Sequence, residues 1–169
     1  MPRAPRADAS SLDPAERARE IALRLLTHSA RSRAQLREGL VSRDVDEDLA
    51  DEIVARYEEV GLLDDGALAS TIARTRHQER GKSRRAISQE LARKGFDAAH
   101  VDEALAQISD EDEYEAARAL GRKRWDQLAG VDHDARVRRV VGMLGRKGYS
   151  PSVAFALVKD FSRADDIGA

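Results

Sequence analysis

Apolar residues recur along this 169-residue chain at spacings of three and four, in stretches separated by short polar turns. Such spacing places apolar side chains on one face of a helix, whereas strands require a period-two alternation, which is nearly absent here. Many stretches follow a Ser or Asp suited to a helix N-cap, and glycines stand where several of them end. The pattern therefore predicts an all-α chain.

The predicted helices fall into three groups of three. The first group is expected near residues 14–28, 32–42 and 46–60, the second near 64–79, 83–94 and 98–108, and the third near 112–127, 133–147 and 151–162. We therefore predict three-helix repeats at 13–62, 63–109 and 110–162, with a disordered N-terminal tail at 1–12 and a C-terminal tail at 163–169.

Each group has enough apolar residues for a small core, and an aromatic content of only 4% argues against one large core. Trp125, near the end of a predicted helix, is expected to pack between helices rather than to stack on a base. The expected core residues are Ile21, Leu25, Leu36, Leu40, Val45, Leu49, Ile53, Leu68, Ile72, Ile87, Leu91, Phe96, Val101, Leu105, Tyr114, Leu120, Val140, Leu144, Tyr149, Val153, Leu157 and Phe161.

The middle helix of each group, with the turn that follows it, recurs at intervals of just over fifty residues. The copies are 32–40, 83–91 and 136–144, aligned so that Leu36 corresponds to Ile87 and Val140. The turns are Ser42-Arg-Asp-Val45, Arg93-Lys-Gly-Phe96 and Arg146-Lys-Gly-Tyr149. Tandem repeats of this kind predict an elongated, curved array with an extended binding surface.

The overall net charge of −2 conceals strong local segregation. Residues 74–95 contain eight Lys or Arg and two Glu, and residues 118–148 contain nine Lys or Arg and three Asp. Acidic blocks lie at 44–65, with ten carboxylates, and at 97–115, with eight. A locally basic face can bind a polyanion whatever the total charge of the chain.

The basic side chains in the second and third groups are therefore the candidate binding residues. Such side chains neutralise phosphates and release counterions, which gives salt-dependent affinity with little sequence preference. The candidate residues are Arg76, Arg80, Lys82, Arg84, Arg85, Arg93, Lys94, Arg122, Lys123, Arg124, Arg136, Arg138, Arg139, Arg146 and Lys147.

The residues that support catalysis or metal binding are sparse. The chain has no cysteine, and its four histidines stand apart from one another without the spacing of a local metal pair. We therefore expect no enzymatic activity, no catalytic residue, no metal and no cofactor. The absence of cysteine also fits a reducing cytoplasm, and no apolar run approaches the roughly 20 residues that span a bilayer.

Two glycine motifs in the chain resemble phosphate- or nucleic-acid-binding loops only superficially. Gly81-Lys-Ser83 lacks the upstream glycine and the preceding strand of a phosphate-binding loop. Gly145-Arg-Lys-Gly148 has the form of a KH-module loop, but that module mixes strands with helices. Because Ala92-Arg-Lys-Gly95 occupies the same place in the second repeat, a shared helix-ending turn explains the second motif.

Taken in order, several segments resemble the bacterial RecX regulatory proteins. The central run Leu62-Leu-Asp-Asp65, followed by Gly81-Lys-Ser-Arg-Arg-Ala-Ile-Ser-Gln-Glu-Leu-Ala-Arg-Lys-Gly-Phe96, is similar to their second repeat. Residues 22–26 and 32–37 resemble the first repeat, and residues 125–130 and 146–149 the third. The turn Ser42-Arg-Asp44 departs from the family pattern because it lacks the glycine, which raises the question of its local geometry.

The resemblance implies a regulator of the RecA recombinase. Members of this family have three tandem three-helix repeats, associate with the groove of the RecA filament on single-stranded DNA, and suppress its ATPase and strand exchange. They also influence the coprotease activity behind the SOS response, and they are not enzymes. For this chain we accordingly expect a cytoplasmic monomer that binds the RecA filament and binds single-stranded DNA weakly.

Two other functional classes remain open from the residues alone. Three-helix units with a basic helix are also the usual form of helix-turn-helix proteins that bind DNA on their own. A helical repeat array can also act purely as a protein scaffold. Sequence preference would distinguish the first alternative, and a lack of DNA affinity at low salt would distinguish the second.

Overall fold

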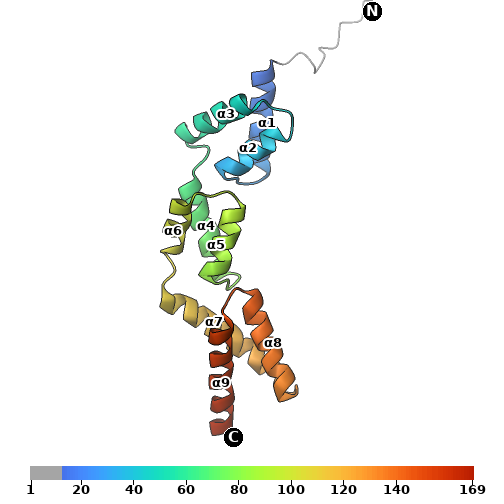
Figure 1. Ribbon diagram of the computed structural model, residues 1–169, viewed down its shortest axis with the longest axis vertical. Helices are drawn as coiled ribbons and strands as arrows, with labels where there is room; N and C mark the ends of the chain where they lie inside the picture. The colour runs from blue at the N-terminus through green and yellow to red at the C-terminus, as the bar shows by residue number, and fades with distance from the viewer. Residues whose placement is uncertain (1–12) are drawn as a thin grey trace, which may run out of the picture. The chain divides into compact units, whose positions relative to one another are not determined.

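The computed structural model describes residues 13–169, which form nine helices and no strand (Figure 1). The first three are α1 (Pro14–His28), α2 (Arg33–Val41) and α3 (Glu47–Glu59). They are followed by α4 (Asp65–Gln78), α5 (Arg84–Arg93) and α6 (Ala98–Leu105). The last three are α7 (Asp110–Gln127), α8 (His133–Arg146) and α9 (Pro151–Gly168). The predicted all-α class and the nine helices are confirmed, while the tail predicted at 1–12 lies outside the described residues.

The end of α9 differs from the prediction. Residues 163–169 were expected to form a C-terminal tail, but the helix continues to Gly168. No proline or glycine interrupts it before that residue, and Asp165 bonds to side chains of α7 and α8. These long-range bonds hold the last turns in helical form.

Local capping explains where several helices begin. The Ser32 hydroxyl accepts the Gln35 N–H while the Gln35 side chain accepts the Ser32 N–H, which completes a capping box at the start of α2. Ser109 and Asp112 make the same reciprocal pair at α7, and these hydrogen bonds lower the pKa of Asp112. The N–H groups at a helix start have no partner within the helix, so these side chains favour helix initiation at these points.

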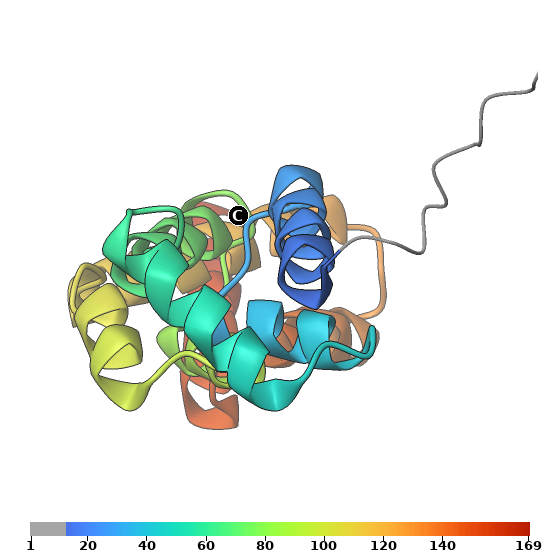
Figure 2. The same ribbon diagram turned by 90° about the horizontal axis from the view of Figure 1, so that it is seen from above.

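The chain divides into two compact units. Unit 1 comprises the chain up to Leu68 together with Lys94–Phe96, and unit 2 comprises Ala69–Arg93 and Asp97–Ala169. In unit 1, each of α1, α2 and α3 packs against the other two (Figure 2). In unit 2, α7, α8 and α9 pack on one another in the same way, and α5 packs on α6.

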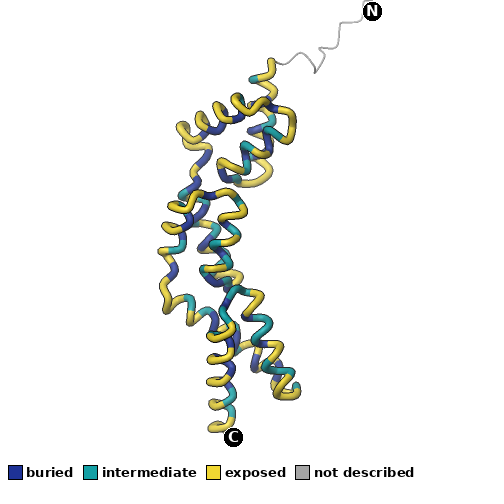
Figure 3. The backbone as a smooth tube through the Cα atoms, viewed as in Figure 1, coloured by how far each residue is buried: buried dark blue, intermediate teal, exposed yellow. Residues whose placement is uncertain are grey.

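Buried residues recur along one side of each helix, as Figure 3 shows. Leu36 and Leu40 are fully buried in the unit 1 core, while Val140 and Leu144 are fully buried in unit 2. Trp125, 1% exposed, packs among the helices of the third group as expected. The prediction of Tyr114 as a core residue is wrong, because this side chain is 44% exposed. It lines an open hollow at the start of α7.

The start of α2 in unit 1 is bound by residues from later in the chain. The buried Ser32 hydroxyl donates to the carbonyl oxygen of Lys94 at 2.5 Å. The Arg33 N–H, free at the helix start, donates to the Asp65 carboxylate at 3.0 Å. A side chain at Gly95 would collide with Ala34, so this contact requires glycine in addition to the positive φ of 82°.

The start of α5 in unit 2 is bound in a corresponding way. The backbone N–H of buried Ser83 donates to the carbonyl oxygen of Lys147 at 2.9 Å. The Arg84 N–H donates to the Glu113 carboxylate, also at 2.9 Å. A Cβ on Gly148 would collide with the Ser83 hydroxyl and lie 2.6 Å from the Ala86 Cβ. The same kind of contact therefore recurs one repeat further along the chain.

Asp44 occupies the corresponding turn position of the first repeat. Its φ of 62° lies in the same left-handed region as those of Gly95 and Gly148. Asp reaches this region more readily than most residues because its short polar side chain can hydrogen-bond locally. The turn geometry is therefore kept despite the missing glycine.

Candidate polyanion interface

Asp165 on α9 binds two of the candidate basic residues. Its carboxylate lies 3.1 Å from Arg122 Nη2 and 3.4 Å from Arg136 Nη1, and it accepts a 2.8 Å hydrogen bond from the Trp125 indole. That indole hydrogen bond, with Arg122 and Arg136, lowers the pKa of Asp165. Both arginines therefore join helices within the third group.

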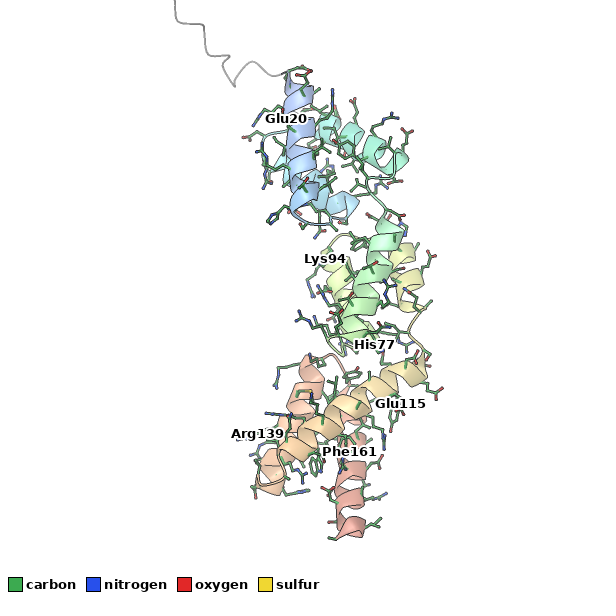
Figure 4. The ribbon with its side chains drawn as sticks, turned by 180° about the vertical axis from the view of Figure 1, so that it is seen from behind. Glu20, His77, Lys94, Glu115, Arg139 and Phe161 are labelled. Atoms are coloured by element: carbon green, nitrogen blue, oxygen red, sulfur yellow. The ribbon has the colours of Figure 1, made fainter. Side chains whose placement is uncertain are left out.

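Trp125 is enclosed by the same network. The Arg136 guanidinium lies 3.7 Å from the centre of the Trp125 ring, and its Nε donates to the Trp125 carbonyl oxygen. Phe161, on α9, packs near the indole, with its ring centroid 6.4 Å from that of Trp125 (Figure 4). Cation–π and aromatic contacts of this kind stabilise packing. The indole is thus a packing group and is not exposed to stack on a base.

Arg84 is also bound internally. Its guanidinium contacts the Asp110 carboxylate and lies 2.9 Å from Glu113, and it donates to the Ile108 carbonyl oxygen. The hydrogen bonds that Arg84 donates to Asp110 and then to Glu113 raise the pKa of Arg84. With about a third of its side chain exposed, Arg84 serves mainly to fasten α5 to the start of α7.

Glu90 neutralises two further candidates in the second group. Its carboxylate, 16% exposed, lies 2.8 Å from Arg76 Nε and 3.8 Å from Lys82 Nζ. The bond from Arg76 involves both carboxylate oxygens of Glu90, at 2.8 and 2.9 Å. A charge-assisted contact of this geometry is among the stronger hydrogen bonds in proteins.

The other candidate residues make no ion pair among residues 13–169. Most are exposed, while Lys94 and Lys147 are half-buried, and Arg124 donates only to the neutral Gln127 side chain. Figure 4 shows Arg139 on the outer side of α8. These residues are Arg80, Arg85, Arg93, Lys94, Lys123, Arg124, Arg138, Arg139, Arg146 and Lys147.

Two exposed cations of α9 were not among the candidates. Lys159 and Arg163 both lie on the solvent side of this helix and form no ion pair within the described part of the chain. The segments rich in Lys and Arg end before these two residues, and the helix itself was predicted to end before Arg163. Helical spacing that continues past residue 162 is the sequence signal that would have included Arg163.

Both cations of α2 are ion-paired, whereas α5 and α8 also carry cations without an ion pair. Arg33 pairs with Glu58, and Arg37 pairs with Asp51 at 2.6 Å and with Glu47. The hydrogen bond that Arg37 donates to Asp51 raises the pKa of Arg37. The acidic helix α3 thus neutralises the basic side chains of the helix before it.

Two general features of the described residues bear on function. No group of three or more His, Asp or Glu side chains within 13–169 is arranged to hold a metal ion. Among the helices that the structure describes, none is long and apolar enough to cross a membrane.

Comparison with known proteins identifies each group of helices. Residues 18–56 match the first three-helix domain of RecX, residues 64–105 the second, and residues 110–158 the third. The matched segments together cover most of the chain and follow one another in the family's order.

Individual relatives agree with these matches. The regulatory protein RecX of Streptomyces coelicolor is 47% identical over 147 residues, covering 87% of this chain and 78% of its own. That of Mycolicibacterium smegmatis is 40% identical, covering 85% and 78%. A solved RecX structure from Lactobacillus salivarius superimposes with a TM-score of 0.74 at 23% identity, covering 89% of this chain and 97% of that one.

A second solved structure, of a regulatory protein RecX, has a TM-score of 0.72 at 28% identity, covering 88% of this chain and 72% of that one. The similarity thus extends over all three helical groups, both in sequence and in fold. The chain belongs to the RecX family of regulatory proteins.

Proposed function

We propose that this chain is a non-catalytic regulator of RecA that binds the RecA filament on single-stranded DNA and lowers its ATPase and strand-exchange activities. By the same binding it would modulate the coprotease activity that triggers the SOS response and so act in DNA repair and recombination. The observation that carries the proposal is the match of all three repeats, in order, to RecX domains. RecA and its DNA would place the chain in the cytoplasm.

The charge distribution supports binding to a nucleoprotein filament. The cations of unit 2 without ion pairs can neutralise phosphates, with the salt-dependent affinity that counterion release produces. The acidic side chains of α3, including Glu47 and Asp48 in its first turn, would be repelled by DNA alone. A partner containing both phosphates and protein accommodates both kinds of surface.

Stand-alone helix-turn-helix binding is less well supported. In such proteins the N-terminal residues of the recognition helix read bases in the major groove, and this helix follows the turn. The third helix of the first group, α3, begins with acidic residues and carries Asp51 and Glu52 in its next turn. Carboxylates at this position would face the DNA phosphates unfavourably.

The function can be tested with purified RecA. ATP hydrolysis by RecA on single-stranded DNA should fall when the chain is added at sub-stoichiometric to equimolar ratios. DNA should be in excess, so that simple competition for DNA does not lower the rate. Unchanged hydrolysis and unchanged strand exchange across this range would end the proposal. Selection of a preferred DNA sequence by the chain alone would instead favour the helix-turn-helix alternative.

The repeat boundaries are part of the same proposal. We place them at 13–62, 63–109 and 110–162, with the last repeat extended along α9 to Gly168. The family domains begin and end inside these limits. We also propose that the free protein is a monomer, which sedimentation would test.

A further inference from the structure

Two exposed arginines recur at the same register in the second and third repeats. The alignment that pairs Ile87 with Val140 also pairs Arg85 with Arg138 and Arg93 with Arg146. Each pair is eight residues apart, which is about 12 Å along a helix and within about 80° around its axis. All of these arginines belong to unit 2 and are exposed.

On α5, the carboxylates near the pair either bind other cations or form no ion pair with it. Glu90, the only acidic residue of this helix, is bound by Arg76 and Lys82. Arg85 lines a hollow of about 330 Å³ with Asp110 and Glu113, both of which bind Arg84. It also lines a second hollow with Asp102, with which it forms no ion pair. The positive charges of Arg85 and Arg93 are therefore not neutralised by an ion pair.

On α8, the buried face of the helix shows that the two arginines point toward solvent. Val140 and Leu144 are fully buried, so Arg138 and Arg146 must lie on the solvent side. The only acidic residue of α8 is Asp134, in the first turn. Between the two arginines lie the half-buried Gly142 and the exposed Gly145, and a Cβ on Gly145 would meet no atom within 4 Å. No carboxylate lies between the paired charges.

The first repeat lacks the pair. The corresponding residues of the chain are Ala34 and Ser42. The arginines that α2 does carry, Arg33 and Arg37, are held by Glu58 and Asp51. The repeated feature is therefore confined to the second and third repeats, although the three repeats share their helical plan.

We propose that Arg85 with Arg93 and Arg138 with Arg146 are the contacts of this protein with the sugar–phosphate backbone of single-stranded DNA. Guanidinium groups bind phosphates in a bidentate manner, and unpaired ones do so without first breaking an internal ion pair. The first repeat contributes no contact of this kind. The inference rests on the proposed function, because it assigns the DNA-contacting residues of the same surface.

The assignment predicts a specific salt dependence. For single strands the logarithm of affinity falls with the logarithm of salt concentration by about 0.7 per phosphate neutralised. The R85Q/R93Q variant and the R138Q/R146Q variant should each lose about 1.4 from that slope, if each arginine neutralises one phosphate. At about 50 mM salt each double variant should bind roughly ten-fold or more weakly.

Binding of the full chain to a fluorescent oligothymidylate, measured by anisotropy across a salt series, provides the test. The matched control is R37Q/R56Q, which removes two arginines that are paired with Asp51 and Glu59 in unit 1. It removes the same number of positive charges as each unit 2 variant, and its salt dependence should equal that of the wild type. Circular dichroism checks the helicity of every variant, and both unit 2 variants should keep it because none of their four arginines makes an ion pair.

The outcomes separate this inference from the proposed function. A reduced salt dependence of DNA affinity in both unit 2 variants, but not in the control, supports the assignment. An equal loss in the control, or no binding of the wild type even at low salt, overturns it. If the unit 2 variants keep the DNA slope but lose inhibition of RecA ATPase, the arginines contact an acidic protein surface instead, which also overturns it. Wild-type inhibition of RecA is measured separately and decides the proposed function.

Discussion

Individual residues show which candidate charges are available and which are not. Arg84 and Arg85 are neighbours in the sequence, yet Arg84 is bound by two carboxylates and Arg85 by none. The sequence, through its helical spacing, places Arg85 away from the buried Ile87–Leu91 face. It gave no sign that Glu113, 29 residues later, binds Arg84. Substitution of Arg84 is therefore expected to disturb the fold, whereas substitution of Arg85 tests binding alone.

Tyr149 combines a buried ring with a buried hydrogen bond. Its hydroxyl donates to the carbonyl oxygen of Gly81 at 2.8 Å, and burial, followed by the charge of Glu113, raises its pKa to about 12. We expect Tyr149→Phe to destabilise the protein by about 1–3 kcal/mol, because the Gly81 carbonyl loses its partner. Chemical denaturation at pH 7 measures this change in the free energy of unfolding.

The same residue has a predictable effect at high pH. Because the folded pKa is raised, the contribution of Tyr149 is complete below its unfolded value near 10 and is lost as pH rises toward about 12. The alkaline loss of stability should therefore be smaller in Tyr149→Phe than in the wild type. Tyr114→Phe, at an exposed tyrosine, is the control and should retain the wild-type profile. An identical alkaline profile for all three proteins would contradict this account.

At the scale of helices, Asp165 joins α9 to α7 and α8. We expect Asp165→Asn to lower the melting temperature at neutral pH, because Arg122 and Arg136 lose their shared carboxylate. The folded pKa of Asp165 is depressed, so its contribution is present above the unfolded value near 4 and is lost as pH falls through the folded value. The melting temperatures of variant and wild type should thus converge in acid.

Asp166→Asn provides the control for this prediction. Asp166 is the exposed neighbour of Asp165 on the same helix, so its substitution removes the same charge without breaking the network. Trp125 fluorescence follows the local change, since the indole donates directly to Asp165. A melting-temperature difference between Asp165→Asn and wild type that stays constant from neutral pH into acid would exclude the proposed ionic contribution.

The helices themselves were largely predictable because the signals that set them are local. N-caps such as Ser32 and Ser150 and the apolar period lie within one or two turns of the residues they organise. The end of α9 was not predictable in this way. It is held by Asp165, whose partner Arg122 lies 43 residues away in the sequence. Tyr114 was assigned to the core from the helical spacing of apolar residues, but that spacing does not reveal that its site is open to solvent.

At the scale of the whole chain, the turn after α8 fixes the third repeat to the second within unit 2. Gly148 lies at a φ of 95° against Ser83 and Ala86, where a methyl group has no room. We expect Gly148→Ala to destabilise by about 1–2 kcal/mol from the left-handed backbone and by about 1–3 kcal/mol more from overpacking. Thermal or chemical unfolding measures the sum.

Gly61→Ala separates these two contributions. Gly61 has a φ of 80°, but a Cβ there would meet nothing within 4 Å. This variant should therefore show only the backbone part of the destabilisation. If Gly61→Ala and Gly148→Ala lose equal stability, the contact with Ser83 and Ala86 does not require glycine.

Local signals in the amino-acid sequence were sufficient to predict the all-α class, the three-fold repetition, the helix starts and the enrichment of basic residues in the second and third repeats. These properties depend on neighbouring residues, on helical periodicity and on composition, all of which are readable without a fold. The fold was needed to show which cations are neutralised, because carboxylates such as Glu113 and Asp165 reach them through packing between helices. It also explained Gly148, whose missing side chain makes room for a helix start more than sixty residues earlier in the chain.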